Sequence, residues 1–517
     1  MPVDLPPFTP PSRPAAVIEQ PLPYGGKTVR VESHGYQYTV TGNTLLTPAS
    51  IEKHLRAAKD PQEAITTLAA AYRQAGYFLT AVTASRNGHD VSVSVIEGEI
   101  TQSTIPDGLR WFYGGVSHNP SISYDSILRR TLSAESYAAR NGQRLQIGFS
   151  PAIQPGGSAL NVDTTPIPDY FPISGNLIFG NYGSRYASRY VAGGNVSLHP
   201  GKGVEVNANF MAGLTGLTPS TSGSQYYTGG VGFSSITPWG TYGFNTQWTR
   251  YRLGIYGALD NVGTVHTYTF TGSQLLYATD RSRFSANEAY THVSNVISYL
   301  GGAFVLTNQS YDYYSLGLVY SRGYTLLGQG GSATLNATYN QGISGRHGSF
   351  ATYSQTGNPT PQFHYLDAGL TIQQALPLGF SAQINASGQW SPNTLPQQQQ
   401  WVLGGFGSLS AWYPGILVGD SGYLARLNVQ TPAWRRLGLS TRGSVFFETG
   451  GVTNAILYPG TAPWQSLSDV GVGINISTHF GTTISAMAAL PVGWGAVPRA
   501  TREGNRATAY FVLQQGF

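Results

Sequence analysis

The 517-residue sequence contains no cysteine, so it offers neither a disulfide framework nor a thiol site. Charged residues are only 10% of the chain, against about a quarter in average globular proteins. No apolar run reaches the roughly 18 residues of a membrane-spanning helix, which excludes helical spans. The net charge of +5 is small and scattered, and this does not indicate a nucleic-acid partner. These absences disfavour three classes of protein: those with thiol chemistry, those that bind nucleic acid, and those that span a membrane with helices.

The amino terminus also lacks the basic and then apolar pattern of a signal peptide. Either the chain is cytosolic, or its numbering begins after a removed signal with Met1 added. The rest of the sequence favours the second interpretation. Charges are unevenly spread, because residues 1–165 hold 26 of the 53 charged side chains. This distribution predicts two regions that differ in their contact with water.

The first region contains both helical and strand patterns. Residues 1–29 are proline-rich and predict an extended linker. A strand pattern in "GYQYTVTGNTLL" leads to Thr47 as the N-cap of a helix that starts at Pro48. A second helix is expected from Pro61 to Gly76, followed by the strands "YFLTAVTAS" and "DVSVSVIEGEI". The order β-α-α-β-β predicts a small sheet that is covered by two helices.

The second region alternates apolar and polar residues with period two. In "FSAQINASGQW", Phe380, Ala382 and Ile384 fall on one face, and Ser381 and Gln383 fall on the other. Strict alternation indicates strands, and an apolar face without a helical layer to cover it is typical of a transmembrane β-barrel. A soluble β-sandwich is the alternative, but it predicts more charge and no alternation of long and short connectors.

Sixteen segments carry this pattern. They are expected at about 173–181, 187–198, 203–213, 225–236, 239–251, 264–278, 283–296, 310–321, 332–340, 362–374, 378–391, 422–431, 439–449, 467–478, 483–491 and 506–517. Short connectors such as "TP" and "TDRS" alternate with long ones at 252–263, 297–309, 341–361, 392–421, 450–466 and 492–505. Short periplasmic turns and long extracellular loops are the usual arrangement in outer-membrane barrels.

The motifs "TVTGN", "AAAYRQAGYFLTAV" and "VSVIEGEI" resemble a POTRA domain, the periplasmic module of outer-membrane secretion and assembly barrels. The resemblance implies a POTRA domain at 30–99 and a second, weaker copy at 100–165, where "YDSILRRTL" is a helix. The strand pair of this copy turns at Pro155, Gly156 and Gly157. The barrel then occupies 166–517. The expected fold is a transmembrane β-barrel of 16 antiparallel strands preceded by two periplasmic α+β POTRA domains.

The whole chain after residue 30 resembles the two-partner-secretion transporters, the haemolysin/haemagglutinin secretion-activation family. "NLIFGNYGSRYASRYVAGG" is similar to the first barrel hairpin of that family, and "FFETG" is similar to its Phe-x-Asp-x-Gly motif. The resemblance assigns Phe446, Glu448 and Gly450 to the lumen motif and makes 392–421 the sixth extracellular loop, which folds into the lumen. The terminal strand "ATAYFVLQQGF" resembles the signal for barrel assembly. Its residues are Phe511, Leu513 and Phe517.

The tip of the sixth loop departs from the family pattern Val-Arg-Gly-Tyr. The tip is expected at Ser408, Leu409, Ser410, Ala411, Trp412 and Tyr413. Because Ser410 replaces the arginine and Glu448 replaces the aspartate, the usual salt bridge is lost. We expect Glu448 to face water in the lumen and to accept a neutral hydroxyl or backbone donor. A loop that lies over the extracellular mouth is the alternative. The proline-rich start also lacks an evident plug helix.

Gly419-Asp420-Ser421-Gly422 is the sequence around the nucleophile of trypsin-like proteases. A catalytic serine needs a histidine base and an orienting acid, and the ten histidines are scattered. A turn that leads into the next strand is the favoured interpretation. The sequence has no His-x-x-x-His pair, acidic Ca²⁺ loop or phosphate-binding loop. It therefore predicts no enzyme, no catalytic residue, no metal and no cofactor.

The resemblance implies an outer-membrane protein whose POTRA domains lie in the periplasm and bind one large, β-rich exoprotein of haemolysin or adhesin type for export. Membrane lipid and the barrel-assembly machinery are the other expected partners, and the transporter is expected to be monomeric. An insertion factor for other barrels is the alternative function. A barrel that carries a lipase is a third, weakened because no catalytic domain precedes residue 30.

Overall fold

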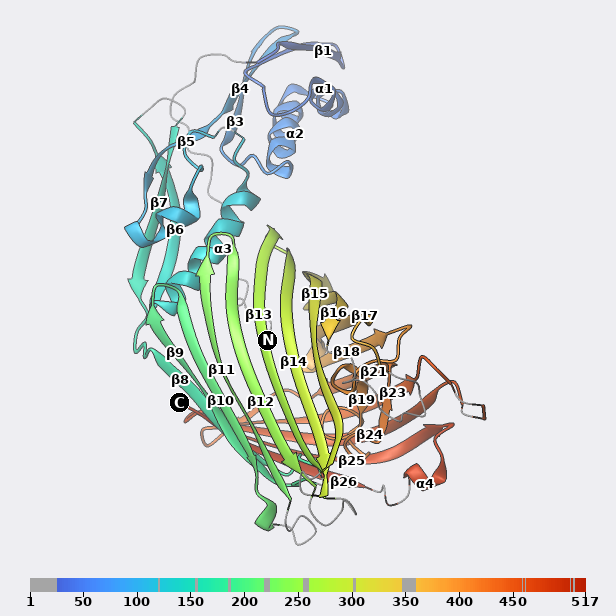
Figure 1. The fold of residues 1–517 in the computed structure, drawn as a ribbon. Helices are drawn as coiled ribbons and strands as arrows, with labels where there is room; N and C mark the ends of the chain where they lie inside the picture. The colour runs from blue at the N-terminus through green and yellow to red at the C-terminus, as the bar shows by residue number, and fades with distance from the viewer. Residues whose placement is uncertain are drawn as a thin grey trace.

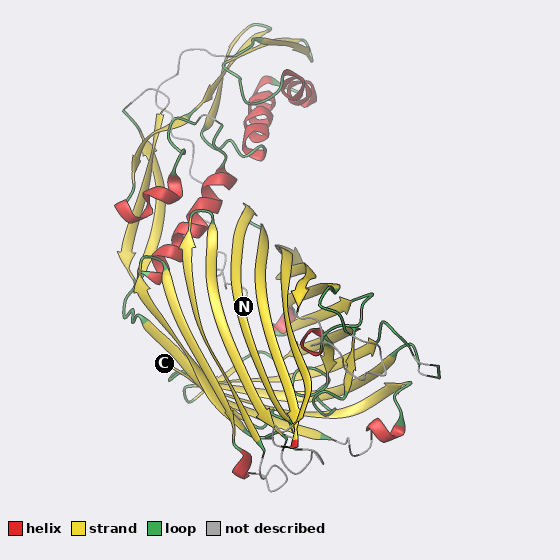
Figure 2. Cartoon of the chain, viewed as in Figure 1, coloured by secondary structure: helices red, strands yellow, loops and turns green. Residues whose placement is uncertain are grey.

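The computed structural model describes residues 26–119, 121–153, 157–184, 187–217, 224–253, 260–300, 304–345, 359–457, 459–460, 462–502, 504 and 507–517. Most of the predicted linker, together with Pro155 and Gly156 of the predicted turn, lies outside these residues. Two small α+β units lie at one end of a large closed barrel (Figure 1). Figure 2 shows that the longer helices belong to the α+β units and that the barrel consists of strands.

The first α+β unit is a four-stranded sheet in the order β1-β2-β4-β3 with two helices. Its elements are β1 (Val29–Ser33), β2 (Tyr36–Thr41), α1 (Pro48–Ala57), α2 (Pro61–Gln74), β3 (Thr80–Asn87) and β4 (Asp90–Glu97). The Thr47 hydroxyl accepts a hydrogen bond from the Ser50 N–H and caps α1, as the sequence predicts. The expected β-α-α-β-β order missed β1, which pairs with β2 at the edge of the sheet.

The second α+β unit has a three-stranded sheet in the order β5-β7-β6. Its elements are β5 (Glu99–Thr104), the 3₁₀ helix η1 (Asp107–Tyr113), α3 (Tyr124–Arg140), β6 (Gln143–Pro151) and β7 (Gly157–Pro166). The predicted strand "DVSVSVIEGEI" is therefore wrong as a single element. Its first part, β4, pairs in one sheet. After the single residue Gly98, β5 begins and pairs in the other sheet.

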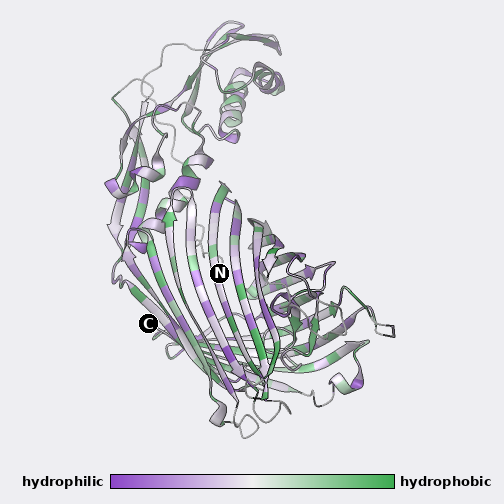
Figure 3. Ribbon diagram, viewed as in Figure 1, coloured by the Kyte–Doolittle hydropathy of each residue, from purple (hydrophilic) through white to green (hydrophobic). Residues whose placement is uncertain are grey.

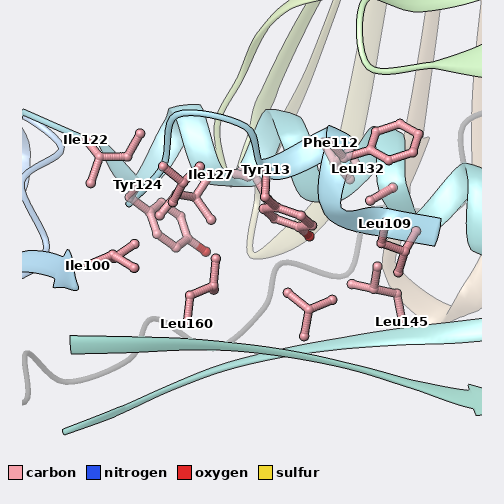
Figure 4. Packing of buried hydrophobic residues seen from close by; sticks show 14 of the residues in the cluster. Ile100, Leu109, Phe112, Tyr113, Ile122, Tyr124, Ile127, Leu132, Leu145 and Leu160 are labelled. Carbon is pink, nitrogen blue, oxygen red and sulfur yellow. The ribbon is translucent and has the colours of Figure 1, made fainter. Parts of the chain in front are cut away.

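One continuous apolar core joins the two units to the barrel. Phe78 and Leu79 of the first unit pack into the core of the second, and Ile236 and Ala278 of the barrel complete the same cluster. Figure 4 shows side chains of α3 and η1 pointing toward those of β6 and β7. Burial of apolar surface contributes about 25 cal/mol per Å², so this core resists separation of the three parts.

The barrel contains sixteen strands that close on themselves, as predicted. Their bounds are β8 (Ile173–Gly180), β9 (Val191–Gly201), β10 (Val204–Gly213), β11 (Gln225–Thr237), β12 (Gly240–Arg252), β13 (Val262–Ala278), β14 (Ser282–Tyr299), β15 (Phe304–Leu326), β16 (Gln329–Gly345), β17 (His364–Ala375), β18 (Ser381–Trp390), β21 (Ser421–Gln430) continued by β22 (Trp434–Arg436), β23 (Leu439–Thr453), β24 (Gln465–Thr478), β25 (Thr482–Gly495) and β26 (Thr508–Gly516). Both β21 and β22 pair with β23, so together they form one barrel strand.

The strands extend further than the period-two pattern predicts. The connector expected at 297–309 is mostly strand, because β14 continues to Tyr299 and β15 begins at Phe304. The added residues include the consecutive apolar Phe304, Val305 and Leu306, which break the alternation, and pairing such as Ile297 with Thr307 extends the ladder there. The short turns nevertheless lie at the end near α3, and the described strand ends that flank the long connectors lie at the other end (Figure 1).

Apolar side chains lie on the outer face of the barrel. On β23, Val445 is 57% exposed and Phe447 is 42% exposed. Phe446, which lies between them, and Glu448, which follows Phe447, are buried. Figure 3 shows the same alternation of hydrophobic and hydrophilic residues along the strands. An apolar outer face and a polar inner face are the pattern of a barrel in lipid. No helix in the described part of the chain has the length and apolarity to cross a membrane.

Helix α3 is fixed against the short turns of the barrel. Nη2 of Arg140 lies 2.9 Å from Oε2 of Glu205 on β10, and Nη1 donates to the Gly203 carbonyl at 2.9 Å. Asn141 accepts a hydrogen bond from the Gly203 N–H at 3.3 Å. Burial raises the pKa of the Glu135 carboxyl on the same helix, and nearby Arg283 opposes this shift. The helix is thus held by apolar packing, an ion pair and backbone hydrogen bonds.

Candidate functional site

The connector 392–421 folds into a compact structure with a short hairpin at its base. The strands of this hairpin are β19 (Trp401–Leu403) and β20 (Leu417–Gly419), which pair antiparallel. The turn beyond them closes on itself, since the Gly404 N–H donates to the Ser408 carbonyl at 2.7 Å and the Gly405 N–H donates to the Trp412 carbonyl at 2.9 Å. Both glycines have positive φ, which a side chain would disfavour.

The tip of this loop lies inside the barrel. The Ser410 N–H donates to Oε2 of Glu448 at 2.6 Å, and the Ala411 N–H donates to Oδ2 of Asp469 at 3.1 Å. The Ser410 carbonyl accepts from the Thr508 hydroxyl at 2.6 Å. These contacts join the tip to strands β23, β24 and β26. Since Glu448 lies on the face opposite to the exposed Val445 and Phe447, the tip occupies the lumen.

Apolar packing holds the same tip. Leu409, Ala411 and Trp412 are buried in one cluster with Phe446 of β23 and Leu467 of β24. Leu409 adopts a φ of 64°, a left-handed conformation that costs free energy for a leucine. The packing of its fully buried side chain compensates for this cost. The two outer members of the tip, Ser408 and Tyr413, are only partly buried, and the Tyr413 hydroxyl donates to the Gly504 carbonyl at 2.6 Å.

A row of charged side chains crosses the barrel wall beneath the tip. Arg426, Glu448 and Asp469 are successive Cα partners on β21, β23 and β24. Nη1 of Arg426 lies 2.9 Å from Oε1 of Glu448, and its guanidinium lies 4.5 Å from the centre of the Phe446 ring. Glu448 and Asp469 are both fully buried. One guanidinium and two backbone N–H groups therefore compensate two buried carboxylates.

This arrangement corrects the expectation for Glu448. The neutral backbone donor is present, but the carboxylate does not face water and it has a cationic partner. The cation comes from the strand next to it instead of from the loop tip. Sequence reasoning missed Arg426 and Asp469, although both occupy inward positions of predicted strands. The signal that could have found them is their charge, because few inward positions of the barrel are charged.

The Gly-Asp-Ser-Gly sequence anchors the loop to the barrel. The buried Asp420 carboxylate accepts hydrogen bonds from the Leu395 N–H at 2.8 Å and from the Ala455 N–H at 3.0 Å. The Ser421 hydroxyl accepts from the Ser391 N–H at 2.9 Å and donates to the Ser391 carbonyl at 3.2 Å. No histidine is among the described partners of Ser421. These two side chains tie both ends of the loop to each other and to the neighbouring connector.

The remaining residues of the lumen motif have direct contacts with this site. Phe446 supports the guanidinium of Arg426, as described above. At Gly450, a Cβ atom would lie 2.9 Å from the Tyr423 carbonyl oxygen and 3.0 Å from Cδ1 of Leu403 on β19. The motif thus contains an aromatic platform, an acid and a position where the loop hairpin approaches the wall closely.

The terminal strand closes the barrel against the first strand. Five Cα pairs link β26 to β8, from Val512 with Gly180 to Gly516 with Asn176. Phe517 extends this ladder, because its N–H and carbonyl pair with those of Gly175 at 3.0 and 3.1 Å. Leu513 is 39% exposed and Phe517 is 65% exposed on the outer surface, while the Phe511 ring lies 5.6 Å from that of Phe179.

Asn181 continues the seam beyond the end of β8. Its side-chain amide donates to the Ala509 carbonyl at 3.0 Å and accepts from the Phe511 N–H at 2.7 Å. The side chain thereby takes the place of a backbone peptide group. The role of Asn181 is not predictable from the sequence, because no local pattern shows that this residue lies beside a residue 330 positions later.

Among the described residues, no group of three histidine, aspartate or glutamate side chains has a geometry that could hold a metal ion. The charged groups of the site are instead paired with one another and with backbone N–H groups. Such an arrangement can hold or release a loop, and it carries no nucleophile with an adjacent base.

The sequence pattern of the family "Haemolysin secretion/activation protein ShlB/FhaC/HecB" matches residues 156–476, more than half of the chain. The chain belongs to this family. The match includes the loop, its tip and the three charged residues beneath it. The resemblance inferred from "FFETG" and the first hairpin is therefore confirmed.

Similar proteins agree with this membership. The chain is 25% identical over 337 residues to the heme/hemopexin transporter protein HuxB of Haemophilus influenzae, a match that covers 57% of this chain. It spans about half the length, 54%, of this curated relative. Among solved structures, CdiB from Escherichia coli has a TM-score of 0.76 at 18% identity and covers 95% of this chain and 91% of its own. CdiB from Acinetobacter baumannii has a TM-score of 0.71 at 13% identity, with 98% and 92% covered. These likenesses establish the fold.

Proposed function

We propose that this protein is an outer-membrane transporter that secretes a large, β-rich exoprotein partner from the periplasm to the cell surface. Membership of the haemolysin secretion/activation family supports this function. The observation that carries it is the polar barrel interior with a long loop whose tip is held there by a few polar contacts. A lumen that is closed by a releasable loop suits the passage of an extended polypeptide. The family match does not favour an insertion factor for other barrels.

The two α+β units are assigned as POTRA domains at 30–99 and 100–165, followed by the barrel at 166–517. Their position beside the short turns of the barrel supports a periplasmic location, because outer-membrane barrels keep short turns on that side. The barrel would be monomeric, surrounded by lipid, and inserted by the barrel-assembly machinery through the strand that carries Phe511, Leu513 and Phe517.

Recruitment of the partner is proposed to occur by strand addition to an exposed sheet edge. Among the residues that the structure describes, β1 pairs only with β2 and β3 pairs only with β4, so each strand has one edge without a described partner strand. An extended peptide adds to such an edge through main-chain hydrogen bonds. The partner would then pass the lumen and fold outside the cell, which favours transport in one direction without a nucleotide or covalent chemistry.

Secretion itself tests the function. The full chain is expressed with a β-rich exoprotein from a neighbouring gene, if the genome encodes one there, and the amount of exoprotein outside the cell is measured with and without the transporter. Loss of export in its absence supports the proposal. Export that is unchanged, together with fewer assembled barrels of other kinds, would instead identify an insertion factor.

A substitution on the edge strand tests recruitment. Arg30→Pro on β1 removes a backbone N–H, whereas Arg30→Ala keeps it. The proline variant should bind the partner more weakly than the alanine variant, in a pull-down with the full-length transporter. Equal binding of the two variants would exclude strand addition at β1.

A further inference from the structure

Three arginines lie on the inner face of one part of the barrel wall. Arg426 lies on β21, and Arg442 lies on β23, where it shares a face with Ser444 and Glu448. Arg435 on β22 is the Cα partner of Ser440, which is on the same face of β23. Arg435 and Arg442 lie next to the short turn between β22 and β23. The three side chains therefore lead from the end of the barrel near α3 toward the loop tip.

Two cavities follow this line of arginines. The first has a volume of 260 Å³ and is lined by Arg442 together with Gln430, Ser444 and Asn475. The second has a volume of 390 Å³ and is lined by Arg426, with Asn428 of the same strand and Gly407 of the loop. Since Asn428 and Gln430 occupy successive inward positions on β21, the cavities lie one after the other along the wall.

The two ends of the line differ in their charge balance. Arg426 is paired with Glu448, as described above. Arg442 is exposed, its Cα partner on β24 is the neutral Asn475, and no ion pair of Arg442 occurs in the described part of the chain. Its neighbours in the first cavity are serine and amide side chains. An exposed guanidinium among neutral groups attracts an anion, and a carboxylate matches its geometry.

The spacing along the wall fits an extended chain. Arg442 and Glu448 are six residues apart on one strand, which is about 20 Å at 3.3 Å per residue. An extended polypeptide that runs beside the wall has the same rise, so carboxylates a few residues apart on one segment reach Arg442 and Arg426 together. The guanidinium of Arg426 has five N–H donors, and it faces the second cavity as well as Glu448.

We propose that Arg435, Arg442 and Arg426 form a binding track for acidic segments of an extended polypeptide in the lumen. This inference rests on the proposed function and names the chemistry of the segment that the transporter accepts. A carboxylate bound at Arg426 competes with Glu448 for the same guanidinium. Because the same Glu448 carboxylate also accepts the Ser410 N–H, withdrawal of the guanidinium leaves a buried carboxylate without its cation and weakens the site that holds the loop tip.

Peptide binding to the full-length protein tests the track directly. The probe is a fluorescent synthetic peptide of repeated Gly-Ser-Asp units, and the comparison peptide has Asn in place of Asp. Fluorescence anisotropy with the detergent-solubilised protein gives the dissociation constants. We expect the acidic peptide to bind more tightly and its affinity to fall with added salt. Equal binding of the two peptides would overturn the proposal.

The chain provides a matched control for the arginines. Arg436 lies beside Arg435 but is the Cα partner of Leu439, which faces outward. Arg442→Gln should raise the dissociation constant of the acidic peptide on the order of tenfold. It should also lower the association rate and make binding less sensitive to salt. Arg436→Gln should leave the affinity unchanged, and Arg442→Lys, which keeps the charge but loses the planar fork, should retain part of it. Equal effects of Arg442→Gln and Arg436→Gln would locate binding outside the track and overturn the proposal.

The outcomes separate this inference from the proposed function. If the exoprotein is not secreted by the native chain but the acidic peptide binds through Arg442, the secretion function fails and the track stands. If the exoprotein is secreted but binding of the acidic peptide does not depend on Arg442, the secretion function stands and the proposed track fails. The resistance of each variant to unfolding by heat, measured on gels, confirms that it has a closed barrel.

Discussion

Arg426 and Glu448 lie directly opposite each other on neighbouring barrel strands, with Nη1 of the arginine 2.9 Å from Oε1 of the glutamate. The glutamate is fully buried, and its other oxygen holds the tip of the long loop through the Ser410 N–H. The Glu448 carboxylate therefore links the Arg426 guanidinium on the neighbouring strand to the backbone of the loop at Ser410. The stability of the barrel and the position of the loop depend on the same ion pair.

Removing the arginine should destabilise the barrel strongly. Arg426→Gln leaves the buried Glu448 carboxylate without its cation, and loss of one partner of a buried ion pair costs about 3–5 kcal/mol of unfolding free energy. Urea unfolding in lipid vesicles measures this change. Arg426→Gln combined with Glu448→Gln should recover part of the loss. Arg442→Gln, the control, should change the unfolding free energy by less than about 0.5 kcal/mol.

The backbone donor of the loop tip can be removed selectively. Ser410→Pro eliminates the N–H that donates to Glu448, a hydrogen bond to a charged group worth about 1.5–3 kcal/mol. Ser410→Ala retains this N–H and loses only the bond from the Gly407 N–H to the hydroxyl at 3.2 Å. We expect chymotrypsin outside the cell to cleave at Trp412 at least about tenfold faster in the proline variant. Equal protection in both variants would show that packing alone holds the tip.

The asparagine at the barrel seam should contribute to closure. Asn181→Ala removes the two amide hydrogen bonds to β26, which together are worth about 1–3 kcal/mol. The temperature at which the barrel unfolds on a semi-native gel should fall. Asn176→Ala provides the control, since residue 176 pairs with Gly516 through its backbone. If both alanine variants unfold at the same temperature, the amide of Asn181 has no special role in the seam.

The carboxyl-terminal residue should be required for efficient assembly. The Phe517 backbone pairs with Gly175, and a Cβ on Gly175 would lie 2.6 Å from the Asn195 carbonyl oxygen and 2.7 Å from Cζ of the Phe517 ring. Deletion of Phe517 and Gly175→Val should both reduce the amount of barrel in the outer membrane, measured after membrane fractionation. Helix α3 and the two small sheets should remain folded. Normal barrel levels in the deletion variant would contradict an assembly role for this residue.

The contact between α3 and the barrel should depend on pH through Glu135. Burial raises its pKa, so the protonated form is favoured in the folded protein. The stabilisation by protonation is fully present below the unfolded pKa of about 4.3 and is lost as pH rises through the folded pKa. Glu135→Gln should therefore raise the unfolding temperature at neutral pH and change it little at about pH 4. A variant that is less stable than the native chain at neutral pH would show that the attraction to Arg283 outweighs burial.

Much of the fold could be predicted because it depends on local patterns. Thr47 and Pro48 mark the start of α1 through capping chemistry that needs only neighbouring residues. The alternation in "FSAQINASGQW" identifies a strand and its two faces without reference to any other strand. Lipid outside and water inside require the same alternation on every strand, so counting the segments that carry it gives sixteen strands, the number in the closed barrel. The alternation does not locate the strand ends, since β15 begins within a predicted connector.

The sequence by itself determined the barrel, its strand number, the inward face of Glu448 and the absence of an arginine at the loop tip. Only the tertiary structure decided which groups compensate Glu448. Arg426, Asp469 and the Ser410 N–H belong to different segments, and register between strands brings the first two beside Glu448. The loop backbone reaches the same place by folding inward. Register and loop path are properties of the closed barrel, because each depends on pairing between residues that are distant in the chain.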